Sequence, residues 1–183
     1  MKKTIFAAAL VLGFGAIAHA ADGKYQVGVG LFDSLPMSGD FKDGVKSSLG
    51  FNAYGDYKVT DMFSVGVEIG DVLGYPIKAD TSIKLRTLSY GVRGKIVKPM
   101  DFGSKKGNVY GIVGVTNDRW SVNQGSESVT KVGYNAGLGA QMEVSANWLV
   151  GLEVRYHIFK TDVGGENMTA NSLAPALTVG YSF

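Results

Sequence analysis

The last stretch of the chain, LAPALTVGYSF over residues 173–183, alternates apolar side chains with small or polar ones. Leu173, Leu177, Val179, Tyr181 and Phe183 share one parity, and because strand side chains alternate between two faces, they share one face of a strand. Chain ends are usually the least ordered part of a soluble domain. An aromatic last residue on such a face therefore raises the question of which solvent that face meets.

The beginning of the chain indicates export. Lys2 and Lys3 form a cationic start, TIFAAALVLGFGAIA follows as an apolar run, and AHA ends at Ala20 as a small-residue cleavage site. This pattern predicts a signal peptide over residues 1–20. An N-terminal anchor is the alternative, but the apolar run is shorter than the roughly 20 residues of a spanning helix. We expect residues 21–183 to form the mature domain.

The composition of the mature chain bounds its function. Removing residues 1–20 takes away Lys2 and Lys3 and brings the formal net charge from +2 to zero, which argues against a nucleic-acid partner. The absence of cysteine excludes disulfides and thiolate metal sites. No Pro- or Ser-rich linker divides the chain, so we expect a single domain.

The body of the chain alternates repeatedly between apolar and small or polar residues, and each such run predicts a strand. In the fifth run Val109, Val113 and Val115 compete with Tyr110 and Ile112 for the apolar face, so its facing stays open. The predicted strands cover residues 25–32, 48–58, 63–70, 88–96, 108–117, 131–143, 148–158 and 173–183.

The connections between these runs alternate in length. VTDM and VSAN are tight turns, residues 97–107 are a longer exception, and long loops are predicted over 34–46, 71–82, 117–130 and 160–171. Short turns at one end and long loops at the other are typical of outer-membrane barrels.

The face opposite the apolar one favours a membrane barrel over a soluble one. It combines glycine with charge, and small residues inside a narrow barrel leave room for charged side chains to pair. The predicted lumen charge network is Glu68, Arg93, Lys95, Glu143, Glu153 and Arg155. The predicted interfacial aromatic girdle is Tyr25, Tyr57, Phe63 and Trp148, together with Tyr181 and Phe183. We therefore predict an all-β, eight-stranded, antiparallel up-and-down transmembrane barrel, with a soluble periplasmic ligand-binding barrel as an alternative.

The signal peptide, the eight runs, GLGAQMEVSANWLVGLEVRY and the terminal YSF resemble the small Gram-negative outer-membrane barrels related to the transmembrane domain of outer membrane protein A and to the X-type and opacity-type proteins. The resemblance implies an integral outer-membrane location, with lipid and lipopolysaccharide as partners. It also implies that the barrel-assembly machinery reads the last strand, where Leu177, Val179, Tyr181 and Phe183 match the family pattern.

The same resemblance suggests how the interior is filled. Barrels of the outer membrane protein A type carry acids and bases on the third, fourth, sixth and seventh strands, and their pairing blocks or opens a narrow path. Here the matching positions are Glu68, Lys95 or Arg93, Glu143 and Arg155. Glu143 lies close to the VSAN turn, so Glu153 is its substitute. A structural network is favoured over ion conduction, because filled interiors are normal in narrow barrels.

Enzymatic chemistry finds little support in the sequence. His157 is the single histidine of the mature chain, and the segment around it faintly resembles lipid A deacylase barrels, which place a serine two residues later. Phe159 stands at that position. We predict no catalytic residue and no cofactor. We also predict no metal site, because no histidine and carboxylates occur at ligand spacing.

The sequence thus predicts a non-enzymatic membrane scaffold that displays loops for envelope integrity or surface attachment. The identity of a surface ligand is left open, with Tyr75 and Trp120 as candidate loop contacts or, more simply, aromatic anchors at the outer rim. A narrow gated channel is the first alternative, and a lipid A-modifying enzyme is a more distant one.

Overall fold

A computed structural model describes residues 23–123, 128–163 and 166–183 of the chain. The predicted signal peptide lies outside these residues. Within them the chain forms eight strands and one short helix. The elements are β1 (Tyr25–Pro36), α2 (Gly39–Gly44), β2 (Ser48–Thr60), β3 (Phe63–Pro76), β4 (Lys84–Phe102), β5 (Lys105–Val122), β6 (Ser128–Ser145), β7 (Trp148–Val163) and β8 (Glu166–Ser182).

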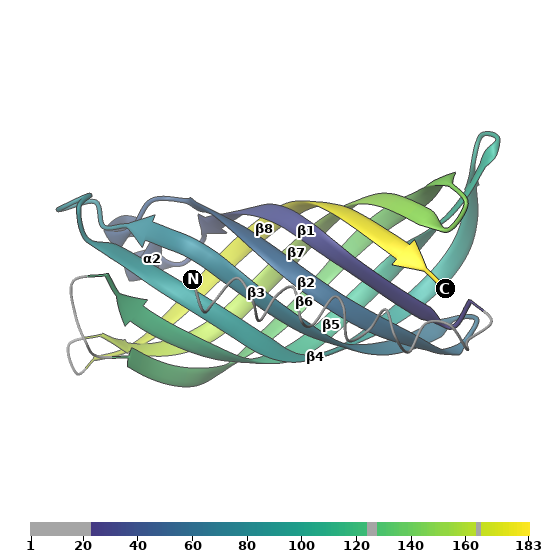
Figure 1. Cartoon of the computed structure of the whole chain (residues 1–183). Helices are drawn as coiled ribbons and strands as arrows, with labels where there is room; N and C mark the ends of the chain where they lie inside the picture. The colour runs from purple at the N-terminus through teal and green to yellow at the C-terminus, as the bar shows by residue number, and fades with distance from the viewer. Residues whose placement is uncertain (1–22, 124–127, 164–165) are drawn as a thin grey trace, which may run out of the picture.

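The strands form a closed antiparallel ring in which each strand pairs with its sequence neighbours and β8 returns to β1. Figure 1 shows the strands tilted against the long axis of the barrel. Closure leaves no unpaired strand at a sheet edge, which is the arrangement that a sheet needs in a lipid environment. The predicted eight-stranded up-and-down topology is confirmed.

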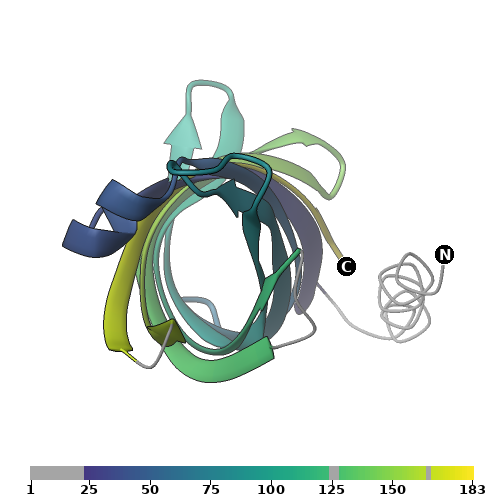
Figure 2. The same cartoon turned by 90° about the vertical axis from the view of Figure 1, so that its left-hand side faces the viewer.

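The two ends of the barrel differ. At one end, here called the turn rim, short turns at 61–62, 103–104 and 146–147 join the strands. The chain ends there too, where the Phe183 N–H donates a hydrogen bond to the Tyr25 carbonyl at 2.8 Å. The other end, here called the loop rim, carries α2 and the connection 77–83. Viewed from the loop rim, α2 lies beside β8 (Figure 2).

The two faces of each strand meet different surroundings. Large apolar side chains of one parity point out of the barrel, and Val92 and Leu138 keep 59% and 73% of their surface exposed. In β5, whose facing the sequence left open, Val113 points outward whereas Tyr110 and Ile112 are buried inside. The physical reason is the register, because the inward positions opposite Tyr110 and Ile112 on β6 are glycines.

The strands reach further toward the loop rim than the apolar alternation predicted. Residues 117–122, 128–130, 160–163 and 166–171 were expected in loops but are paired as strand. The turn-rim connection 97–107 also continues as a paired hairpin up to residues 102 and 105. These boundaries were wrong because backbone pairing needs no apolar face, whereas periodicity detects only strands that have one.

Among the described residues, the single helix is far too short to cross a membrane.

Candidate functional site

Charged side chains from four strands meet inside the barrel, and we call this set the ionic layer. Its members are Asp56 from β2, Glu68 from β3, Arg93 and Lys95 from β4, and Glu153 and Arg155 from β7. None of these side chains is more than 12% exposed. Three carboxylates face three cations, so the layer as defined is neutral overall.

One half of the ionic layer is built around Asp56. The Nε and Nη2 groups of Arg93 donate to the two carboxylate oxygens of Asp56 at 2.7 and 2.6 Å. The Lys95 ammonium lies 3.3 Å from Asp56 Oδ2. A guanidinium that binds a carboxylate with two parallel hydrogen bonds is held in position as well as stabilised. Arg93 Nη1 then lies 3.6 Å from Glu68 Oε2, which joins this half to the next.

The other half is built around Arg155. Its guanidinium donates hydrogen bonds to both Glu68 and Glu153. The Tyr110 hydroxyl donates to Glu153 Oε2 at 2.8 Å, and the Asn135 amide donates to Glu68 Oε1 at 3.3 Å. The contacts therefore form one continuous chain from β2 across the interior to β7.

Two aromatic rings pack against the cations of the layer. The Arg93 guanidinium carbon lies 3.8 Å from the centre of the Tyr54 ring, and Lys95 Nζ lies 4.2 Å from the centre of the Tyr110 ring. A cation over a ring face is attracted to it, more strongly where water is excluded. The rings thus fill space between the charges while adding to their stabilisation.

Glycines make room for these large side chains. In the strand register, four large side chains in or against the layer stand directly opposite a glycine, and a methyl group on that glycine would collide with its surroundings. The opposed pairs are Tyr54 with Gly28, Arg93 with Gly66, Tyr110 with Gly139, and Arg155 with Gly137. The glycines of the inward face are therefore the sequence signal that marks where large inward residues cross the lumen.

The ionic layer differs from the predicted charge network at two residues. The structure brings Glu68, Arg93, Lys95, Glu153 and Arg155 together, but not Glu143, whose carboxylate accepts a hydrogen bond from the Asn147 N–H at 3.4 Å at the turn rim. Placing Glu143 in the network was wrong, because it lies too near the VSAN turn to reach the layer.

Asp56 is the member of the layer that sequence reasoning missed. Its parity puts it on the inward face of β2, and its carboxylate is the partner of both Arg93 and Lys95. The sequence did show an acid with inward parity between Tyr54 and Lys58. The predicted network does not include it, because the family pattern places no acid on the second strand.

A second buried group lies in the interior near the loop rim. We call it the aromatic cap; its members are Phe41 of α2, Tyr75 of β3, Trp120 of β5 and Phe159 of β7. The Phe41 ring centre lies 5.1 Å from that of Tyr75, 6.1 Å from that of Trp120 and 5.7 Å from that of Phe159. Aromatic pairs at such separations are stabilising beyond the area they bury.

The aromatic cap corrects the expected role of two residues. Tyr75 and Trp120 were predicted as loop contacts or rim anchors, but they point inward and are 1% and 3% exposed. The Tyr75 hydroxyl is hydrogen-bonded to the Ser34 hydroxyl at 2.5 Å. The prediction failed because β3 and β5 continue past the residues expected to be loop, which turns both rings into the barrel.

Two cavities lie on either side of the ionic layer. One, of about 80 Å³, lies between the aromatic cap and the layer and is lined by residues of both, including Tyr75, Phe159, Glu68 and Arg155. The other, of about 290 Å³, lies on the turn-rim side and is lined by Asp56 and Lys95 of the layer.

His157 belongs to the first cavity. Its Nε2 atom lies 3.1 Å from the Thr116 hydroxyl and 3.2 Å from Asp118 Oδ2. Phe159, two residues later, is buried in the aromatic cap and offers no nucleophile. Within the part of the chain that the structure describes, no three His, Cys, Asp or Glu side chains gather as metal ligands.

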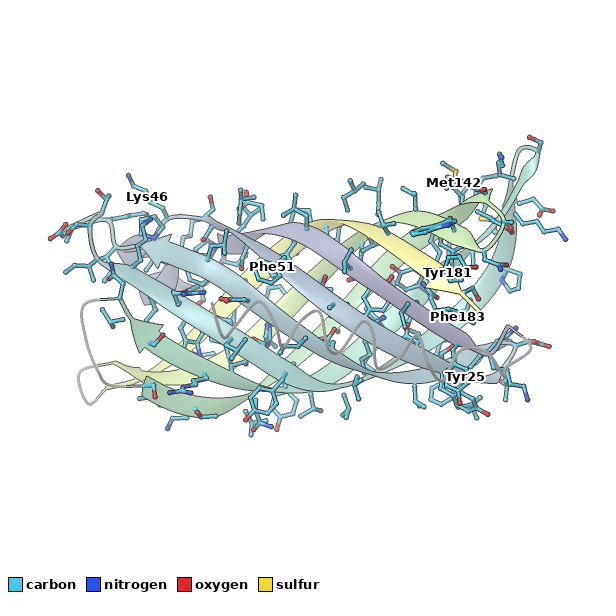
Figure 3. The ribbon with its side chains drawn as sticks, in the orientation of Figure 1. Tyr25, Lys46, Phe51, Met142, Tyr181 and Phe183 are labelled. Atoms are coloured by element: carbon cyan, nitrogen blue, oxygen red, sulfur yellow. The ribbon has the colours of Figure 1, made fainter. Side chains whose placement is uncertain are left out.

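Aromatic side chains gather at the turn rim. Tyr25 contacts Tyr57 with ring centres 5.1 Å apart, and Tyr181 contacts Trp148 at 5.2 Å and Phe183 at 4.8 Å. Figure 3 shows Tyr25, Tyr181 and Phe183 at the same end of the barrel. Phe63 is 41% exposed at the start of β3, next to the 61–62 turn. The predicted girdle residues thus share this rim. Leu177, a member of the predicted assembly signal, points outward and is 52% exposed.

The family model for the outer membrane protein beta-barrel domain matches residues 4–183. The chain belongs to this family. It is therefore an integral protein of the Gram-negative outer membrane, with the apolar outer face of its barrel in lipid. A search of curated protein sequences found no significant match.

Solved structures of small outer-membrane barrels are similar to this fold. Neisserial surface protein A has a TM-score of 0.62 and 17% identity over 88% of this chain and 98% of its own. OprG from Pseudomonas aeruginosa has a TM-score of 0.59 and 15% identity over 88% and 96%. Ail, the attachment invasion locus protein of Yersinia pestis, solved with the heparin analogue sucrose octasulfate, has a TM-score of 0.55 and 18% identity over 89% and 100%. At these identities the likeness shows the fold alone.

Proposed function

We propose that this protein is a non-enzymatic scaffold of the outer membrane, that its interior does not conduct, and that its work is done at the loop rim. The observation that carries the proposal is the pair of barriers in series. The ionic layer links β2 to β7 across the interior with every member in an ion pair, and the aromatic cap lies buried between this layer and the loop rim, which supports a closed interior. An ion would have to break buried charge pairs and then cross a layer of packed rings, and each step is costly.

The loop rim is the surface that such a scaffold presents. α2 and the connection 77–83 are joined there, because the Lys78 N–H donates to the Gly44 carbonyl at 2.9 Å and its ammonium to the Lys42 carbonyl at 2.8 Å. Ser82 donates two hydrogen bonds to the exposed Asp80 carboxylate, which hold the pKa of Asp80 below its usual range. Ordered loops on a rigid frame are where recognition usually occurs. We propose surface attachment or envelope integrity as the role of this rim.

The assembly of the barrel belongs to the same proposal. β8 closes the ring against β1, and the outward-facing series Leu177, Val179, Tyr181 and Phe183 ends at the turn rim. We propose that the barrel-assembly machinery reads this series, in keeping with the family pattern. Deleting Phe183 should lower the amount of folded protein in the outer membrane, whereas deleting a residue of the 103–104 turn should not.

A narrow gated channel is the second candidate, and one feature favours it. Arg155 contacts both Glu68 and Glu153, and Glu68 also lies within 3.6 Å of Arg93. Because Arg155 and Glu68 each have two partners, either can lose one contact and keep the other, so the layer can rearrange without leaving one of them unpaired.

Planar-bilayer conductance separates the two candidates. The protein should be exported in a Gram-negative host, purified in detergent and checked for a mobility that changes on boiling. A scaffold gives no steady current in the wild type or in Glu68→Ala, since the aromatic cap stays in place. Steady current in the wild type, enlarged in Glu68→Ala, favours the gated channel and rejects the closed scaffold.

A further inference from the structure

The outer surface of β4 carries cations directly beyond its apolar band at the loop rim. The outward positions from Leu88 to Ile96 are apolar or glycine, and these nine residues match the length of a tilted strand that crosses the hydrocarbon. Arg86 and Lys84 continue the same outward parity toward the loop rim, and both are at least partly exposed. Because the short turns of outer-membrane barrels face the periplasm and the longer loops face outward, these side chains leave the band where the outer-leaflet headgroups begin.

β5 adds a third cation at the same place. Arg119 pairs directly with Leu88 in the register, is exposed, and donates a hydrogen bond to the Ser128 hydroxyl at 3.2 Å. It is diagonal to Arg86, and diagonal residues on paired strands lie about 7–8 Å apart. The long side chains of Lys84, Arg86 and Arg119 therefore reach a common area on the outside of the barrel.

In the described part of the chain, one carboxylate borders this area. Asp71 of β3 pairs with Leu88 on the other side, and its Oδ2 atom accepts a hydrogen bond from Arg86 Nη2 at 2.6 Å. The pair orients the Arg86 guanidinium while neutralising part of the local charge. Among the residues that the structure describes, two positive charges remain in excess at the boundary between lipid and headgroup.

We propose that Lys84, Arg86 and Arg119 bind the phosphates of the lipid A headgroup in the outer leaflet. Planar guanidinium groups match phosphate with two hydrogen bonds, and the lysine adds a mobile point charge. The phosphate belongs to a lipid because the three side chains point out from the barrel wall, immediately beyond the apolar band. Residues that bind a free soluble anion have no need of that position.

The direct test is titration of the detergent-solubilised, lipid-depleted protein with synthetic diphosphoryl lipid A, read by native mass spectrometry as the fraction of protein that carries one lipid. The variant Lys84→Gln/Arg86→Gln/Arg119→Gln should bind about tenfold more weakly or worse. The control Lys24→Gln/Lys98→Gln/Lys105→Gln removes the same charge from the turn rim and should bind as the wild type does.

A second variant tests the site by strengthening it. Asp71→Asn removes the carboxylate that competes for Arg86, so it should bind diphosphoryl lipid A about threefold more tightly. If the Arg86–Asp71 pair served the barrel wall alone, this variant would bind no better than the wild type.

Several results overturn the proposal. Equal binding of diphosphoryl and dephosphorylated lipid A would mean that phosphate is not recognised. If the loop-rim and turn-rim triple variants lost the same affinity for lipid A, binding would depend on the overall charge of the protein rather than on these three residues. If inorganic phosphate bound with the same affinity as the lipid and displaced it at millimolar concentration, the three cations would be assigned to a soluble anion.

Discussion

The ionic layer and the aromatic cap are both buried inside the barrel, but they are fixed by different means. Every member of the layer comes from a strand, so the register of the closed ring determines where each charge lies. The cap takes three rings from strands and its fourth, Phe41, from the six-residue helix α2. The backbone positions of the layer therefore stay fixed as long as the strands stay paired, whereas the cap can lose one ring while the barrel stays closed.

The energetics of the two regions also differ. Removing one partner of a buried ion pair leaves an uncompensated charge. The loss of folding free energy is then larger than the net stabilisation that the intact pair provides. Removing a ring from the cap loses transfer free energy and leaves a void. The comparison thus predicts a graded series of effects, in which the layer gives the largest losses and α2 the smallest.

The largest expected effect is that of Arg93→Met. This variant removes the guanidinium that donates two hydrogen bonds to Asp56, and we expect it to lower the free energy of unfolding by about 3–5 kcal/mol. Urea unfolding in lipid vesicles, followed by gel mobility, measures it. The matched control is Arg86→Met, which breaks an ion pair whose arginine is 41% exposed and should cost less than about 1 kcal/mol.

A double variant sharpens that test. Asp56→Leu/Arg93→Met removes one charge of each sign but leaves Lys95 without its carboxylate partner, so it should recover only part of the stability that Arg93→Met loses. A double variant that is less stable than the single one would show that the unpaired Lys95 ammonium costs more than the unpaired Asp56 carboxylate.

Trp120→Ala tests the strand-borne part of the cap. The ring is 3% exposed and packs against Phe159 at 4.5 Å, so its loss should lower the free energy of unfolding by about 3 kcal/mol in the same assay. Trp148→Ala at the turn rim, where the side chain is 48% exposed, should cost clearly less. Equal losses at the two positions would contradict the placement of Trp120 in the cap.

The glycines of the inward face give a smaller effect with a clean control. Gly139→Ala places a methyl group against the Tyr110 ring, and we expect a loss of about 1–3 kcal/mol. Gly111→Ala, on the neighbouring strand, meets its nearest atom at 3.9 Å and should be neutral or slightly stabilising. A tolerated alanine at both positions would mean that the interior can rearrange around the layer.

Phe41→Ala should give the smallest change in global stability. Because α2 can detach while the ring stays closed, we expect less than about 1 kcal/mol in the unfolding assay. Hydrogen exchange of residues 39–45 should nevertheless become faster, and exchange in β3 and β5 should not. A large global loss would show that α2 is part of the cooperative unit.

The sequence predicts these two regions to different extents. Parity placed Glu68, Arg93, Lys95, Glu153 and Arg155 inside, because a strict period of two leaves each strand only two faces. It did not place Asp56 in the network, since parity gives a face but not a partner. The register that sets Asp56 opposite Gly66 comes from the closed ring.

The cap lay beyond sequence reasoning for a different reason. Trp120 lies in a segment without apolar alternation, and Phe41 lies in a connection whose helix has too few residues to show a period. Their meeting depends on how far β5 extends and on how the chain between β1 and β2 turns back over β8, and neither is a local property of the sequence.

The central claim is that the layer and the cap block the interior in series, and a set of bilayer recordings tests it most directly. We compare Glu68→Ala, Phe41→Ala/Trp120→Ala and the three changes combined, using folded protein with heat-dependent mobility. We expect both partial variants to stay silent and the combined variant to conduct. Steady current through Glu68→Ala alone, or a silent combined variant, would contradict it.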